Sequence, residues 1–416
     1  MKTSKKILLR YGEIFLKSAP VFRQFERKLL ENVKKALKRS KISFEIKKER
    51  GRIFVLTEKE KEAIEELRKV FGLVSFSPVY HLETSELKEI KKFCQEKFKN
   101  FLKKKETFAI RARRIGRHPF SSQDLENEVG KVIEGKVNLK NPAKEIFLEV
   151  RGNDTYIFTE IFPGPGGLPI STAGRVISFL SGGIDSPVAS FLAMKRGCSV
   201  IFLHFHSFPL VSKKSIEKCR KIIAKLNDHQ FEGKLILFPF QKIQVHLKTQ
   251  APAKYLILLY RRSMVRIGQK IAKIEGAEGI FTGESLAQVS SQTLSNLATI
   301  EEAVKIPIFR PLIGMDKEEI INLARKIGTY EISILPQEDC CTLFVPKHPA
   351  TKSDPKVLKE IEKKLKNWKI QSLKKGKKLL FEIFSSGWFK SQFFVKPRRE
   401  NLTHFVNLRF SKRKPC

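Results

Sequence analysis

Hydrophobic and polar positions recur with two different periods along residues 1–82. In the stretch 21–40, apolar side chains from Phe22 to Leu37 recur every three or four positions, which is the spacing of one buried helical face. Short apolar runs before and after this stretch have the length of strands, and a second helical pattern covers 60–71. The predicted order is strand, helix, strand, strand, helix, strand, which is typical of a small ferredoxin-like α+β fold.

The next part of the chain mixes the same two patterns. Helices are predicted at 86–102 and 123–134, with strands between and after them. The proline- and glycine-rich run 163–169 follows, and its composition is typical of a rigid, turn-rich linker. We expect a domain boundary at this linker.

From Arg175 onward, apolar strand-like runs alternate with helical stretches. Strands are predicted at 176–180, 200–205, 235–238 and 279–282, each separated from the next by helix. This alternation predicts an α/β domain with a doubly wound parallel sheet. The ligand of such a sheet is expected at the carboxyl ends of its strands.

Composition narrows the class of protein. Hydrophobic residues make up 41% and charged residues 30% of the 416 positions, which excludes a disordered chain. No apolar run is long enough to span a membrane and the N-terminus has no secretion signal, so we expect a cytoplasmic protein without membrane attachment. The six cysteines contain no C-x-x-C pair. This argues against a disulfide scaffold, a zinc site and the common iron–sulfur spacings, and we predict no resident metal site.

The chain is strongly basic, with 81 Lys and Arg against 43 Asp and Glu and a net charge of +38. A field of this sign attracts polyanions, chiefly nucleic acid, although an AT-rich genome would also raise the lysine content. The densest arginine cluster lies at 111–118 and begins in the predicted strand 107–113, so Arg111 and Arg113 share one face. Phosphate contacts to structured RNA or a solvated face both fit this cluster. The predicted RNA-binding residues are Arg111, Arg113, Arg114 and Arg117.

A candidate phosphate loop follows the first strand of the α/β domain. The strand 176–180 leads directly into Ser181-Gly182-Gly183-Ile184-Asp185-Ser186, and Pro187 then opens a helix. Glycines allow the backbone to approach an anion, and a helix N-terminus offers free N–H groups. We expect Ser186 to be the N-cap of this helix. The sequence lacks the Walker pattern here, so this is a different type of phosphate loop.

The motif S-G-G-x-D-S resembles the PP-loop of the ATP pyrophosphatase family, which cleaves ATP to AMP and pyrophosphate. Three further segments, 10–17, 283–293 and 338–342, are similar to the tRNA uracil 4-sulfurtransferase family, which is also linked to the thiazole of thiamine. The resemblance implies a ferredoxin-like region, a THUMP domain and a PP-loop domain, the first two binding tRNA. The expected boundaries are 1–60, 61–165 and 166–385, followed by a basic tail at 386–416.

The resemblance also implies the chemistry. ATP, with Mg²⁺, would adenylate O4 of the uridine at position 8 of tRNA, and sulfur carried by a cysteine would then replace the adenylate to give 4-thiouridine. Asp185 and Cys341 match the family's catalytic residues. The matching nucleotide contacts are Phe179, Leu180, Ser181, Gly182, Gly183, Asp185, Ser186, His204, Phe205, Arg261, Gly283 and Gln292.

Several points stay open at this level. Cys340 adjoins Cys341 and either thiol fits the role of sulfur carrier, whereas Cys94, Cys198 and Cys219 fall in apolar patterns and are expected in the core. Many family members carry a C-terminal rhodanese domain that relays sulfur, and too few residues follow the cysteine pair here to form one. The donor is therefore expected to be a cysteine desulfurase, another persulfide donor or sulfide. A homodimer and a role for the basic tail in gripping RNA also stay open.

Three rival functions remain. Another PP-loop ligase that modifies tRNA would need no cysteine, and a non-catalytic tRNA-binding protein would not bind ATP. An iron–sulfur thiolase lacks the expected cysteine spacing.

Overall fold

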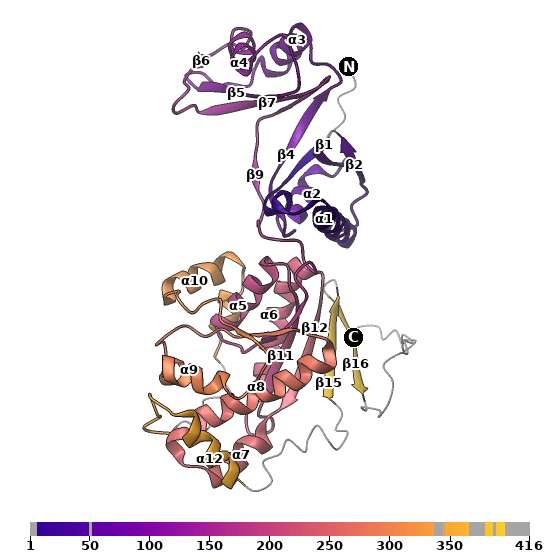
Figure 1. Cartoon of the computed structure of the whole chain (residues 1–416). Helices are drawn as coiled ribbons and strands as arrows, with labels where there is room; N and C mark the ends of the chain where they lie inside the picture. The colour runs from indigo at the N-terminus through magenta and orange to yellow at the C-terminus, as the bar shows by residue number, and fades with distance from the viewer. Residues whose placement is uncertain are drawn as a thin grey trace.

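The computed structural model describes residues 6–49, 52–336, 344, 346–365, 379–385 and 388–395. Figure 1 shows three packed units in a row: the first lies in the middle of the view, the second above it and the third below it. Cys340, Cys341 and the lysine-rich segments 374–378 and 411–414 lie outside the described residues.

The first unit has the predicted ferredoxin-like order. Two helices cover one face of an antiparallel sheet with strand order β2-β3-β1-β4. Leu29, Val33 and Leu37 of the first helix are fully buried against the sheet, as their spacing predicts. The elements are β1 (Lys6–Tyr11), η1 (Glu13–Leu16), α1 (Ala19–Arg39), β2 (Glu45–Glu49), β3 (Arg52–Leu56), α2 (Glu60–Leu67) and β4 (Leu73–Leu82).

The expected boundary between residues 60 and 61 falls inside this unit. Ala63, Ile64 and Leu67 of α2 are buried in the same hydrophobic core as α1, and β4 pairs with β1. Separating α2 and β4 from β1 would expose that core, so the boundary at 60 is wrong as a physical division.

The second unit shares a sheet with the first through β4. Residues 80–82 of that strand pair with β8, so a nine-stranded sheet runs through both units. Two helices cover its second part, where Ile90, Leu125 and Ile146 are fully buried. The elements are α3 (Leu87–Phe98), β5 (Thr107–Ile115), α4 (Ser122–Gly130), β6 (Lys136–Val137), β7 (Lys144–Arg151), β8 (Asp154–Phe158) and β9 (Phe162–Pro163).

The third unit is the predicted doubly wound α/β domain. Its seven-stranded sheet has the order β14-β13-β10-β11-β12-β15-β16, and the first five strands in this order are parallel. One hydrophobic core lies on each face of the sheet. The strands are β10 (Arg175–Phe179), β11 (Ser199–His206), β12 (Glu232–Pro239), β13 (Gly279–Phe281), β14 (Ile308–Phe309), β15 (Leu379–Ser385) and β16 (Trp388–Val395).

Helices on both faces of this sheet complete the domain. The helices α5 (Asp185–Lys195), α6 (Lys214–Gln230) and α10 (Lys317–Lys326) pack on one face, with α11 (Tyr330–Ser333) beside them. On the other face lie α7 (Gln241–Gln250), α8 (Leu256–Glu275), α9 (Leu294–Glu301) and α12 (Pro355–Lys364). In the described part of the chain, no helix has both the length and the apolar character that a membrane crossing requires.

The C-terminal side of this sheet differs from the expectation. β15 pairs antiparallel with β12, and β16 pairs antiparallel with β15. The expected boundary between residues 385 and 386 therefore cuts a hairpin, because the second strand belongs to the sheet and not to a separate tail.

Candidate active site

Hydrogen bonds from the backbone to serine hydroxyls within the loop hold the conformation of the segment between β10 and α5. The backbone N–H of Ser181 donates to Ser186 Oγ over 2.9 Å, and the N–H of Gly183 donates to Ser181 Oγ over 3.2 Å. The helix begins at Asp185 with Ile184 as N-cap, and no side chain caps it. The expectation that Ser186 is the N-cap is therefore wrong, because its hydroxyl turns back to the loop. The first N–H groups of α5 are left without a side-chain acceptor, and such groups suit an anion.

Buried contacts hold this loop from behind. Ser190 Oγ donates to the carbonyl oxygen of Ser186 over 2.9 Å and lies 2.8 Å from Ser178 Oγ. Gly283, which follows β13, approaches so closely that a Cβ there would lie 2.7 Å from the backbone nitrogen of Ser186. The loop is thus fixed by β10, α5 and the end of β13 together.

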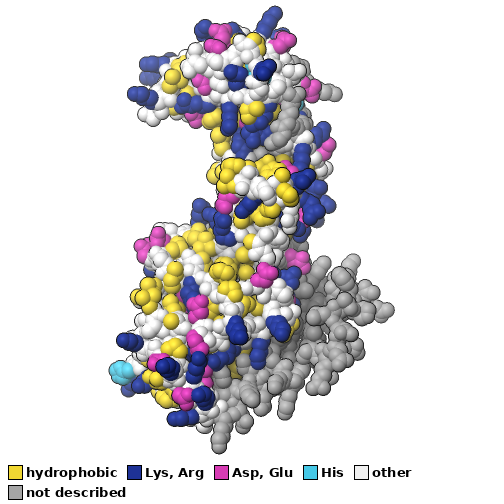
Figure 2. All heavy atoms as spheres, in the orientation of Figure 1, with side chains coloured by type: hydrophobic (Ala, Val, Ile, Leu, Met, Phe, Trp, Pro, Cys, Tyr) yellow, Lys and Arg dark blue, Asp and Glu magenta, His cyan; other side chains and the backbone are white. Residues whose placement is uncertain are grey.

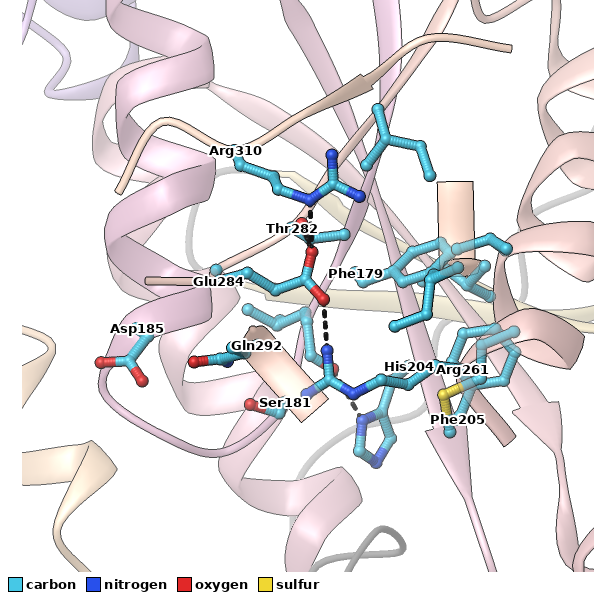
Figure 3. A pocket seen from close by; sticks show the side chains of 17 residues that line it. Phe179, Ser181, Asp185, His204, Phe205, Arg261, Thr282, Glu284, Gln292 and Arg310 are labelled. Atoms are coloured by element: carbon cyan, nitrogen blue, oxygen red, sulfur yellow. Dashed lines mark hydrogen bonds and ion pairs between the residues drawn. The ribbon is translucent and has the colours of Figure 1, made fainter. Parts of the chain in front are cut away.

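A cavity of about 230 Å³ opens beside the loop at the carboxyl ends of β10, β11 and β13 (Figure 3). The structure gathers most of the predicted nucleotide contacts around it, while Gly182, Gly183 and Ser186 shape the adjoining loop. The predicted residues that line the cavity are Phe179, Leu180, Ser181, Asp185, His204, Phe205, Arg261, Gly283 and Gln292.

One side of the cavity is apolar. The rings of Phe179 and Phe205 meet edge to face with centroids 5.3 Å apart, and Met264, Val265 and Ile300 continue this wall. Ligand pockets are commonly lined in this way, with a few polar groups that set orientation. The wall suits a planar aromatic group such as a nucleobase.

A buried carboxylate organises the opposite side. Glu284 is 5% exposed and lies between Arg261 and Arg310 (Figure 3). Its Oε2 accepts hydrogen bonds from Arg310 Nε over 2.8 Å and from Thr282 Oγ1 over 2.9 Å, and its Oε1 pairs with Arg261. Burial alone would raise the pKa of Glu284, but the two guanidinium groups hold the pKa below its usual value. Glu284 is therefore ionised and fixes both arginines.

Glu284 and Arg310 line the cavity without a sequence pattern that indicates them. Glu284 lies inside the family-like segment 283–293, so the motif contained it without indicating a role. Arg310 reaches the cavity because the two-residue strand β14 pairs with β13. No hydrophobic period reveals so short a strand.

Asp185 lies at the phosphate-loop side of the cavity. Its Oδ1 is 2.6 Å from Lys317 Nζ at the start of α10, and its Oδ2 accepts a hydrogen bond from Gln288 Nε2 over 3.0 Å. Among the described residues, no group of three or more His, Cys, Asp or Glu side chains is placed to hold a metal ion. A single carboxylate beside a phosphate loop fits Mg²⁺, which protein sites usually hold with one or two carboxylates and the substrate's phosphates.

His204 is buried between the cavity and α6. Its Nδ1 lies 2.9 Å from the carbonyl oxygen of Leu180, so this nitrogen carries the proton and donates. Its Nε2 lies 3.3 Å from Ser215 Oγ. The ring is thereby held in one orientation at the end of β11.

The thiols expected in the core are buried there, as the apolar patterns predicted. Cys94, Cys198 and Cys219 are at most 7% exposed. Burial raises the pKa of Cys94 to about 12 and also raises the pKa of Cys198. Such thiols form little thiolate, so they are poor sulfur carriers. Both candidates for that role, Cys340 and Cys341, lie outside the described residues.

The arginine cluster lies on β5 and the turn after it, in the unit where Figure 2 shows many basic side chains on the surface. The guanidinium of Arg111 has partners within the protein. Its Nε pairs with Glu145 over 2.8 Å and its Nη2 donates to the carbonyl oxygen of Leu139. Arg114 donates to a nearby backbone carbonyl, whereas Arg113 and Arg117 are exposed. A role of this cluster in RNA binding stays a prediction.

These features define a class. A parallel sheet with helices on both faces, an S-G-G-x-D-S loop at its carboxyl edge and a cavity beside an uncapped helix constitute a nucleotide-binding α/β domain of the PP-loop type. Two smaller α+β units that share one sheet precede it.

Comparison with known proteins identifies the family. Residues 171–367 match the thiamine biosynthesis protein (ThiI) family, residues 6–77 its ferredoxin-like domain and residues 84–160 the THUMP domain. A relative from Methanothermobacter thermautotrophicus is 43% identical over 369 residues, which cover 86% of this chain and 93% of the relative. A relative from Methanocaldococcus jannaschii is 38% identical over 383 residues, which cover 88% of this chain and 99% of the relative. Both are named "Probable tRNA sulfurtransferase", and the chain belongs to this tRNA sulfurtransferase family.

A solved structure has the same architecture. The crystal structure of a 4-thiouridine synthetase–RNA complex with bound ATP superimposes with a TM-score of 0.81 at 33% identity, covering 92% of this chain and all of that one. The resemblance inferred from the motifs is confirmed, as is the presence of ferredoxin-like, THUMP and PP-loop domains.

Proposed function

We propose that this enzyme transfers sulfur to the uridine at position 8 of tRNA, giving 4-thiouridine at the expense of ATP. The observation that carries the proposal is that an anion-binding loop and an apolar cavity lie side by side at one edge of the sheet. A nucleoside triphosphate needs both features, one for its phosphates and one for its base. The likeness to a 4-thiouridine synthetase solved with RNA and ATP supports the choice of substrates.

In the first step the uridine O4 attacks the α-phosphorus of ATP, pyrophosphate leaves, and the uridine N3 gives up its proton. The loop 181–186 and the free N–H groups of α5 receive the phosphates, and the base occupies the wall formed by Phe179 and Phe205. Mg²⁺ held by Asp185 and the phosphates would neutralise charge as pyrophosphate departs. Lys317, paired with Asp185, supplies a further positive charge at the same place.

In the second step sulfur displaces the adenylate. The terminal sulfur of a persulfide on Cys341 attacks C4 of the activated uridine and AMP leaves, so that an S–S bond links Cys341 to the base. A second thiol then attacks Cys341 Sγ, forms a disulfide with it and releases the sulfur on C4, and N3 takes up a proton to give 4-thiouridine. Adenylation matters because it converts a poor oxide leaving group into AMP. An external thiol reductant restores the Cys341 thiol, and a cysteine desulfurase or another persulfide donor then reloads it.

The RNA is held by the first two units. Arg113 and Arg117 are exposed guanidinium groups, which suit phosphate oxygens. The family that matches residues 171–367 is named for thiamine biosynthesis, so the same cysteine-borne sulfur is a candidate source for the thiazole. That second role is tested by comparing the growth of a strain that lacks the gene in medium with thiamine and in medium without it.

Pyrophosphate release measured with and without tRNA tests the assignment. We expect release to require tRNA and to stop when the uridine at position 8 is replaced by cytidine, because cytidine offers no O4. A ligase that modifies a different nucleotide would release pyrophosphate equally with both tRNAs, and a binding protein would release none.

A further inference from the structure

The ferredoxin-like unit and the PP-loop unit each bury a phenylalanine of the other. Phe71, which follows α2, is 1% exposed and lies in the α/β core, with its ring centroid 5.2 Å from that of Phe191 and 5.1 Å from that of His229. In the opposite direction, Phe231 follows α6 and lies in the ferredoxin-like core. Two separately folded units do not usually exchange core residues, so this joint fixes their relative orientation.

A charged clamp closes the same joint. Arg39 is the last residue of α1, and its Nη1 donates to the carbonyl oxygens of Asn227 and Asp228 over 3.1 and 3.2 Å. Its Nη2 pairs with Glu66 of α2 over 2.6 Å. Its guanidinium also lies 5.4 Å from the centroid of the Phe231 ring. The last carbonyl oxygens of a helix lack partners within it and form its negative pole, so Arg39 of one unit caps α6 of the other.

The linker between the units is packed and does not act as a flexible tether. The N–H of Gly72 donates to the carbonyl oxygen of Gly166 over 2.8 Å. A Cβ at Gly164 would lie 2.2 Å from the carbonyl oxygen of Leu73, and one at Gly167 would lie 2.1 Å from that of Lys195. The linker thus lies in contact with backbone from both units.

The opposite end of α6 touches the nucleotide site. Ser215 lies in the first turn of α6, and its Oγ is 3.3 Å from Nε2 of His204. Cys219 Sγ lies 3.4 Å from Nδ1 of the same ring. His204 lines the ATP cavity. The 17 residues of α6 therefore connect the cavity to the joint, across about 25 Å at a rise of 1.5 Å per residue.

We propose that Arg39 is a positioning residue for sulfur transfer. By clamping the ferredoxin-like unit to the C-terminal end of α6, it holds bound tRNA in the orientation that brings the uridine to the adenylating site. The inference rests on the proposed function. Arg39 does not line the nucleotide cavity, and it acts through α6 and the joint. The rate of a reaction between two bound groups falls steeply as they are moved out of place, and a misplacement of about 1 Å lowers it about 10²-fold.

The test compares variants of the full chain in single-turnover 4-thiouridine formation at saturating ATP, tRNA and persulfide donor. Arg39→Gln removes the charge and the forked geometry, and Arg39→Lys keeps the charge. Lys363→Gln is the matched control, because it removes an exposed partner of a surface ion pair on α12, on the opposite side of the PP-loop unit from the joint. Equilibrium binding of ATP and tRNA is measured separately for each protein.

We expect Arg39→Gln to lower the single-turnover rate constant by about 10- to 100-fold, with both dissociation constants within about threefold of the original protein. Arg39→Lys recovers part of the rate, Lys363→Gln changes nothing, and amide exchange at 227–231 accelerates only in the Arg39 variants. If Arg39→Gln does not fold, Glu66→Gln weakens the same clamp and should cause a smaller loss in the same direction.

Three results overturn the inference. The first is an unchanged rate in Arg39→Gln, or in Glu66→Gln if that variant stands in for it. The second is a rate loss explained entirely by weaker tRNA binding, which would make Arg39 a binding residue. The third is absence of 4-thiouridine with the unaltered enzyme, which also overturns the proposed function and is thereby distinguished from the first two.

Discussion

Replacement of Gly283 by alanine tests whether close backbone approach sets the shape of the phosphate loop. A Cβ at this position would lie 2.7 Å from the nitrogen of Ser186, 2.8 Å from the carbonyl carbon of Asp185 and 2.9 Å from the Cα of Ser186. All three atoms are backbone, so no side chain can rotate away. To restore an ordinary contact of 3.4 Å, the loop and the end of β13 must separate by about 0.7 Å.

That separation is large relative to the tolerance of the reaction. A displacement approaching 1 Å between reacting groups costs about 10²-fold, or roughly 2.7 kcal/mol in the activation barrier. We therefore expect Gly283→Ala to fold and to bind tRNA normally, and to adenylate about 100-fold more slowly. The assay is tRNA-dependent pyrophosphate release, with ATP affinity measured in parallel.

Gly314→Ala is the matched control. It lies in the same domain next to Met315, whose carbonyl oxygen accepts a hydrogen bond from Ser285, and a Cβ there meets nothing within 4 Å. It should release pyrophosphate at the original rate. Equal rates for Gly283→Ala and the unaltered enzyme would refute the close-approach argument, and equal losses in both variants would show that the effect is not specific to the contact.

Three further predictions concern other parts of the mechanism. Asp185→Ala should abolish pyrophosphate release while tRNA affinity stays within a few fold, and normal release would contradict the role of this carboxylate. Cys341→Ser should stop 4-thiouridine formation without stopping adenylation, because a hydroxyl cannot carry sulfane sulfur, whereas Cys340→Ser should keep most activity; full activity of the double variant would remove both thiols from the mechanism. The pKa of Glu284 is lowered in the folded protein, so its contribution to stability is complete above the unfolded pKa of about 4.3 and is lost as the pH falls through the lower folded pKa. As the pH is lowered below about 5, the urea concentration at the unfolding midpoint should therefore decrease less steeply in Glu284→Gln than in the original protein. Parallel curves of midpoint against pH would count against the paired carboxylate.

Local patterns predicted the fold well where an element is long and its contacts are near in sequence. The helix α1 and the strands β10 and β11 follow directly from hydrophobic spacing. The phosphate loop could also be found, because strand, glycines and helix start adjoin one another. The hydrogen bonds of a side chain within the loop could not be predicted. Whether Ser186 caps α5 or bonds to Ser181 depends on the final backbone path.

Features built by distant segments could not be predicted from the sequence. Glu284 and Arg310 meet only because β13 and β14 pair, and β14 has two residues and no period of its own. The joint at Arg39 brings together residues 188 positions apart. The domain boundary at residue 60 failed for the same reason, since the burial of α2 against α1 is a tertiary contact.

Mass analysis of nucleosides tests whether this enzyme thiolates tRNA at position 8, using an unmodified tRNA transcript treated with the purified enzyme, ATP, Mg²⁺, a persulfide donor and a thiol reductant. We expect one 4-thiouridine per tRNA, at position 8, formed only with ATP and accompanied by equal amounts of AMP and pyrophosphate. An unchanged nucleoside profile with active donor and bound tRNA, or thiouridine that forms equally well without ATP, would contradict the proposed function.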